Sequence, residues 1–95
     1  MKMTEESLLK ETYHPKAYLT KKRNVRLGLR ARTRIISVLE KGARSARAVA
    51  QETGLSYDVV RHHLLLLELE NIVVRRAGRP FSWELTGAGQ QVLTG

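Results

Sequence analysis

The chain has 95 residues, enough for one domain with one hydrophobic core and too few for two. It contains no cysteine, which excludes disulfides and thiolate metal sites and fits a reducing, cytoplasmic compartment. No apolar run approaches the roughly 18 residues of a membrane-spanning helix, and we identify neither a signal peptide nor a membrane anchor.

A formal net charge of +8 indicates a polyanionic partner, and the charge is unevenly distributed. Residues 21–47 contain ten lysines and arginines against a single acid, Glu40. A solvated helix face usually mixes both signs, so this block favours nucleic acid as the partner. An anionic membrane surface is a weaker alternative, because the block lacks a clean apolar face with Trp or Phe.

The N-terminal residues predict a short helix followed by a basic segment. Thr4, with acids directly after it, is typical of a helix start, and Pro15 would stop or bend this helix. Residues 16–27 are basic and weakly patterned, so we expect an arm or the lead-in to the next helix. We therefore divide the chain into an N-terminal helix or basic arm, 1–28, and a DNA-binding domain, 29–95.

Three helices are predicted in the middle of the chain. The first has apolar residues at spacings of three and four, runs from about residue 29 to 41, and stops at Gly42. Ser45 caps the second, which Gly54 ends, and Ser56 caps the third. The inner stripe of the third helix holds Val60, Leu64 and Leu67.

The hydrophobic period changes after Asn71, a residue that tolerates the left-handed conformation at a helix end. Residues 72–77 and 81–86 are typical of strands, and 78–80 form the turn between them. A last short helix, containing Val92 and Leu93, is expected to begin at Thr86. The expected fold is mostly α with a small β-hairpin (α+β).

Residues 46–64 have the layout of a helix-turn-helix. A tight turn at 54–56 joins two helices, Leu55 fills the elbow, and the small Ala46 and Ala50 let the helices approach closely. The third helix is then held out as a ridge that fits a major groove, and the basic hairpin that follows is the wing. The sequence therefore predicts a winged helix-turn-helix with an N-terminal basic arm or helix.

A family resemblance supports this interpretation. Residues 56–64 (SYDVVRHHL), followed by Leu67-Glu68 and Ile72-Val73, resemble the recognition-helix signature of ArsR-like winged-helix regulators. Residues 85–89 (LTGAG) are similar to the strand-to-helix exit of that family and its MarR-like relatives. The resemblance covers about residues 29–93 and implies a dimeric, operator-binding transcription factor. The metal-sensing members carry a cysteine pair before the recognition helix, which this chain lacks.

The outward face of the third helix supplies the candidates for base reading. Arginine can make a bidentate pair with guanine, so Arg61 is the first candidate. The full set is Ser56, Tyr57, Asp58, Arg61 and His62.

Phosphate contacts are assigned to other elements, because residues 56–70 are acidic on balance. The candidates on the wing and around the start of the second helix are Arg75, Arg76, Arg79, Arg44 and Arg47. Those of the basic arm are Lys21, Lys22, Arg23, Arg26, Arg30 and Arg34, of which the last three would form one stripe on a helix.

Two leucines, Leu65 and Leu69, lie one turn apart and off the inner stripe of the third helix. We expect them to pack against a dimer partner or against the N-terminal segment, through Leu8 and Leu9 together with nearby tyrosines. Phe81 and Trp83 are expected to pack the wing onto the core rather than to stack on bases.

We expect no metal, no cofactor and no enzymatic activity. His62 and His63 are adjacent, so on a helix they point about 100° apart and do not converge on one ion. The sequence has no Gly-rich phosphate loop, no cysteine nucleophile and no convergent carboxylate pair.

The expected function is sequence-specific binding of double-stranded DNA by a small, cytoplasmic, homodimeric transcriptional regulator. The alternatives are a non-specific architectural DNA- or RNA-binding winged helix and a protein-interaction module of a transcription complex.

Overall fold

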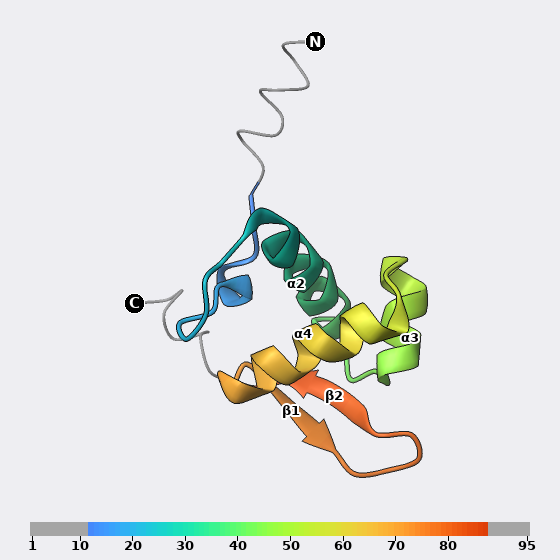
Figure 1. Ribbon diagram of the computed structural model, residues 1–95. Coiled ribbons are helices and arrows are strands. Elements are labelled where there is room, and N and C mark those ends of the chain that lie inside the picture. Colours follow the sequence, from blue (N-terminus) through green and yellow to red (C-terminus); the bar gives the residue numbers. More distant parts are fainter. Residues whose placement is uncertain (1–11, 88–95) are drawn as a thin grey trace.

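The computed structural model describes residues 12–87, in which three α-helices carry a two-stranded antiparallel hairpin (Figure 1). The elements are η1 (Pro15–Ala17), α2 (Arg26–Leu39), α3 (Ala46–Thr53), α4 (Tyr57–Leu69), β1 (Val73–Arg76) and β2 (Ser82–Leu85). This arrangement confirms the predicted winged helix fold. The helices expected after Thr4 and after Thr86 lie outside the described residues. No helix within 12–87 is long and apolar enough to cross a membrane.

Side-chain caps set the ends of α3 and α4 as predicted. The Ser45 hydroxyl accepts a hydrogen bond from the Ala48 N–H at 3.1 Å, and the Ser56 hydroxyl accepts one from the Val59 N–H at 3.2 Å. Gly54 ends α3 in the left-handed conformation, with φ of 79°. These signals turn the chain sharply between α3 and α4, so the N-terminus of α4 projects from the domain.

The helix α2 begins at Arg26, earlier than the expected start near residue 29. Gly28, which weakens the helical pattern in the sequence, is buried in its first turns. A Cβ atom built on Gly28 would lie 2.9 Å from Nη1 of Arg32. The absence of a side chain at Gly28 therefore leaves room for the guanidinium of the buried Arg32.

Residues 12–24 pack against α2 and lead into it. Ala17 and Leu19 are buried in the same core as the helices. Arg32, only 3% exposed, donates from Nε to the Ala17 carbonyl at 2.6 Å and from Nη2 to Oδ1 of Asn24 at 3.0 Å. Asn24 in turn bonds both the N–H and the carbonyl of Leu19. The predicted domain boundary at residue 28 lies inside α2, so we treat 12–87 as one packed unit.

The hairpin is fixed to the helices by a buried tryptophan. β1 and β2 pair from Val73 with Leu85 to Arg76 with Ser82. Trp83 is 2% exposed, and its backbone pairs with that of Arg44, which leads into α3. The expected packing of the wing onto the core is correct for Trp83, whereas Phe81 remains exposed.

We expect Arg32→Ala to lower the free energy of unfolding by about 2 kcal/mol or more, because two acceptors lose their buried donor. Urea unfolding followed by circular dichroism measures this. Arg34→Ala, an exposed position on the same helix, is the matched control and should change stability by less than about 0.5 kcal/mol. Equal effects of the two substitutions would contradict a structural role for Arg32.

Candidate nucleic-acid interface

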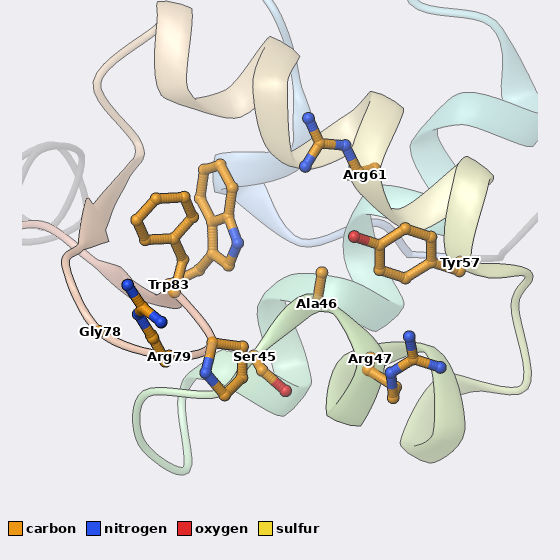
Figure 2. Close-up of a pocket in the computed structure, with 10 residues that line it drawn as sticks. Ser45, Ala46, Arg47, Tyr57, Arg61, Gly78, Arg79 and Trp83 are labelled. Atoms are coloured by element: carbon orange, nitrogen blue, oxygen red, sulfur yellow. The ribbon is translucent and has the colours of Figure 1, made fainter.

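A hollow of about 650 Å³ lies between the N-termini of α3 and α4 and the hairpin (Figure 2). Three separate elements each contribute one arginine to it: Arg47 from α3, Arg61 from α4 and Arg79 from the hairpin turn. No acidic residue lines this hollow within the described chain. The positive charge of this site therefore comes from three arginines that are distant in the sequence and that the fold brings together.

The other polar groups of the hollow are also suited to an anion. Figure 2 shows the Tyr57 hydroxyl and the Trp83 indole nitrogen on the sides that face the hollow. Guanidinium, hydroxyl and indole N–H groups all donate hydrogen bonds, and arginine pairs well with phosphate oxygens. The positive ends of the α3 and α4 helix dipoles border the same space. The lining is thus complementary to phosphate rather than to a cation.

Contacts between aromatic rings and guanidinium groups hold this arrangement. The guanidinium of Arg47 lies 5.6 Å from the ring centroid of Tyr57, within cation–π range. The cap at Ser45 places Arg47 in the first turn of α3, and the cap at Ser56 makes Tyr57 the first residue of α4. The sequence around each cap therefore brings these two side chains together.

The predicted wing arginines have different surroundings. Arg75 lies over the Trp83 ring, 5.2 Å from its centroid, and its Nη2 is 3.3 Å from a carboxylate oxygen of Glu68. Arg76 makes two hydrogen bonds to Glu84, at 3.0 and 2.8 Å. Both are therefore already paired within the chain.

Arg79 has no hydrogen-bonding or ionic partner within residues 12–87, and it is exposed at the hairpin turn. Arg44, also a predicted phosphate contact, bonds Glu52 at 3.0 Å and does not line the hollow. Of the predicted phosphate contacts, Arg79 and Arg47 are the ones that the fold brings into the hollow.

The base-reading candidates form one exposed surface at the start of α4. The Ser56 hydroxyl is used as a cap, while Asp58 and His62 are exposed outside the hollow. Tyr57 and Arg61 belong both to this exposed face and to the hollow. The sequence analysis missed the convergence of Arg61 with the wing, since no local pattern relates these distant positions.

The residues of the predicted basic arm lie on two segments, the stretch before α2 and α2 itself. The Glu70 carboxylate accepts hydrogen bonds from the backbone N–H groups of Thr20 and Lys21, both at 2.9 Å, at the C-terminal end of α4. Lys22 and Arg23 are exposed beside this tie. The other three members of the arm lie on α2: Arg26, Arg30 and Arg34.

The two leucines of α4 remain exposed within the described chain, Leu65 by 36% and Leu69 by 63%. Their predicted packing partners Leu8 and Leu9 lie outside the described residues. Burial of this leucine pair against a partner subunit or the N-terminal segment therefore stays a prediction.

His63 is half-buried and neutral near pH 7. Its Nδ1 lies 3.4 Å from Nη1 of Arg32, and its ring contacts that of His62 with centroids 5.0 Å apart. Burial, then the charge of Arg32 and that of His62, lower the pKa of His63 to about 4. No group of three His, Cys, Asp or Glu residues in 12–87 is arranged to hold a metal ion.

Comparison with known proteins identifies a family and two similar structures. The family described as "DprA winged helix domain" matches residues 29–79. No curated protein sequence matches the chain.

The Zalpha domain from Carassius auratus PKZ, solved in complex with Z-DNA, is 31% identical with a TM-score of 0.57. The match covers 60% of this chain and 94% of that domain. The homodimeric winged helix-turn-helix DNA-binding domain (fragment 1–100) of Mb0332 from Mycobacterium bovis, a possible ArsR-family transcriptional regulator, is 25% identical with a TM-score of 0.59. That match covers 72% of this chain and 62% of the Mb0332 fragment.

We expect the free energy of unfolding to fall as the pH drops from about 6.5 towards 4, because the unfolded chain protonates His63 before the folded protein does. His63→Gln should flatten the stability profile in this window. His62→Gln, at the exposed neighbouring position, is the control and should retain most of the slope, because burial and Arg32 are the larger causes of the lowered pKa of His63. Urea unfolding at several pH values and NMR titration of the His63 ring provide the measurements. A ring that titrates near pH 6.5 would contradict the buried, neutral state.

Proposed function

The chain belongs to the family of DprA winged helix domains, and on this premise we propose that it binds double-stranded DNA, with α4 in the major groove and the hairpin as a wing. The observation that carries the proposal is the hollow beside α4, with one arginine from each of three elements and no acid. Such a site can hold the phosphate backbone of one strand while the exposed face of α4 meets the base edges.

The roles of the side chains divide along this surface. Arg47 and Arg79 hold phosphates in the hollow, because both guanidinium groups line it and neither is paired with an acid among the described residues. Tyr57, Asp58 and His62 face the bases or the adjacent backbone from α4. Arg61, which belongs to both surfaces, reads a base edge. The internally paired Arg75 and Arg76 hold the wing in position and add to its positive field.

At a finer level, we propose a sequence-specific, homodimeric, cytoplasmic regulator similar to ArsR-like proteins. The similarity to Mb0332, a homodimeric domain and possible ArsR-family regulator, supports this reading. The exposed pair Leu65 and Leu69 supplies an apolar surface for a second copy.

A second candidate is recognition of DNA shape rather than sequence. It is favoured by the 31% identity to a Zalpha domain solved with Z-DNA, which this chain matches over 94% of that domain's length. A hollow that binds only phosphates would select a backbone geometry and tolerate any base sequence. Conversion of an alternating CG duplex to the left-handed form by the protein, followed by circular dichroism, would favour this candidate.

We expect duplex DNA to change the fluorescence of Trp83, the only tryptophan of the chain, because its indole lines the hollow. Arg79→Ala should weaken binding to every duplex severalfold and lower the salt dependence of log K by about one. Lys41→Ala removes the same charge at an exposed position outside the hollow and is the control.

Competition tests the class of ligand in the same assay. A genomic site selected from fragments should resist competition by random duplex and by RNA. Equal competition by random duplex would contradict sequence-specific binding, and the absence of any nucleic-acid binding at low salt would contradict the proposed function.

We expect Arg61→Ala to cost about 1–3 kcal/mol on the best site and to relax the preference at one or two base pairs. The cause is loss of a bidentate contact to a base edge. The measurement compares the affinities of the wild type and of Arg61→Ala for the best site and for its single-base variants. An equal loss on all sequences, with a lower salt slope, would show instead that Arg61 binds phosphate in the hollow.

A further inference from the structure

A helix in a major groove has a phosphate backbone on each side. The groove is about 12 Å wide, and a helix with its side chains is about 10–12 Å across, so groups flanking the helix lie close to both backbones. Figure 1 places α2 and the hairpin on opposite sides of α4. The hollow described above lies on the hairpin side and accounts for one backbone only.

The α2 side of α4 has a basic hollow of its own. It has a volume of about 180 Å³ and lies between α2 and the turn that precedes α4. Its lining consists of Leu27, Arg30, Ala31, Arg34 and Leu55. Leu55 stands two residues before Tyr57, which lines the larger hollow, so both hollows lie near the N-terminus of α4, and they share no lining residue.

The second hollow is basic like the first, with two arginines in its lining where the first has three. Arg34 is exposed and Arg30 half-buried, one turn apart on α2. Residues 21–39 contain no acid at all. The 74% exposed Leu27, the buried Ala31 and the half-buried Leu55 supply the apolar part of the lining. A lining of this kind suits the sugar of a nucleotide, with the arginines placed for its phosphates.

We propose that Arg30 and Arg34 bind phosphates of the strand opposite to the one held by Arg47 and Arg79. This inference rests on the proposed function and adds the path of the second strand. The domain then clamps the groove that α4 enters, with α2 on one backbone and the wing on the other. The two basic surfaces of the chain, far apart in sequence, thereby serve one duplex.

Strand-specific neutralisation of the DNA backbone tests the proposal. Duplexes of the selected site carry uncharged methylphosphonate linkages in one strand or in the other. Arg30→Ala combined with Arg34→Ala should lower the salt slope on the unmodified duplex by about two. The loss of affinity of this double variant should nearly disappear on the duplex in which the strand that it contacts is neutralised. It should persist on the duplex in which the opposite strand is neutralised. Arg79→Ala should show the converse pattern.

Controls separate the outcomes. Arg34→Ala, at an exposed position, replaces the double variant if that protein folds poorly, and it should show half of the effect on the salt slope. Lys41→Ala should show no strand preference. The same strand dependence for Arg34 and Arg79 would overturn the inference. A double variant that binds DNA as tightly as the wild type would also overturn the inference. Polyglutamate serves as a probe of an acidic protein partner, and the inference is overturned whether or not this double variant also loses binding to polyglutamate. If either result is found while Arg79→Ala still loses affinity, the inference fails and the proposed function stands. Failure of the wild type to bind any duplex would contradict both the inference and the proposed function.

Discussion

Trp83 exchanges both backbone hydrogen bonds with Arg44, at 3.0 and 2.7 Å, and this bridge joins the hairpin to the segment that enters α3. The indole is buried against the helices, so the hairpin cannot swing away without exposing it. Because the bridge lies one residue before the cap of α3, it fixes the hairpin turn beside the first turn of that helix. The hollow, and with it the meeting of three arginines, depends on this connection.

Internal pairing of the acids determines where the positive charge is available. Within residues 12–87 the carboxylates of Glu52, Glu68 and Glu84 each bond an arginine. Glu40 bonds His14, and Glu70 bonds the backbone near Thr20. The only other described acid, Asp58, lies in the first turn of α4, where the helix dipole favours a negative charge. Within residues 12–87 no acid lines the hollow that Arg47, Arg61 and Arg79 share, so a polyanion meets little repulsion there.

Local signals explain how far the sequence predicts the fold. Ser45 and Ser56 cap helices within a single turn of chain, so their effect is readable without knowledge of tertiary contacts. The start of α2 was misplaced because Gly28 weakens a helix and an arginine such as Arg32 is usually exposed. The two exceptions are related, because the glycine at position 28 makes space for the buried guanidinium of Arg32.

The hollow could not be predicted in the same way. Arg47, Arg61 and Arg79 are separated by more than a dozen residues each, and only the tertiary fold brings them together. The sequence supplied the residue types and their net charge, but it ranked Arg75 with Arg79. Their difference, one paired with Glu68 and the other unpaired within the described chain, is a property of the packing of β1 on α4.

The length of α4 allows DNA reading and subunit assembly to use different ends of one helix. Its 13 residues span about 18 Å, so Leu69 lies well away from the N-terminal turn that we propose enters the groove. Leu69 is 63% exposed, whereas the exposed residues near the N-terminus include the polar Asp58, Arg61 and His62 beside Val59. A leucine surface at that distance would not compete with the phosphates that we propose bind beside Tyr57. The same helix can therefore present polar groups to DNA and an apolar surface to a second copy without either contact obstructing the other.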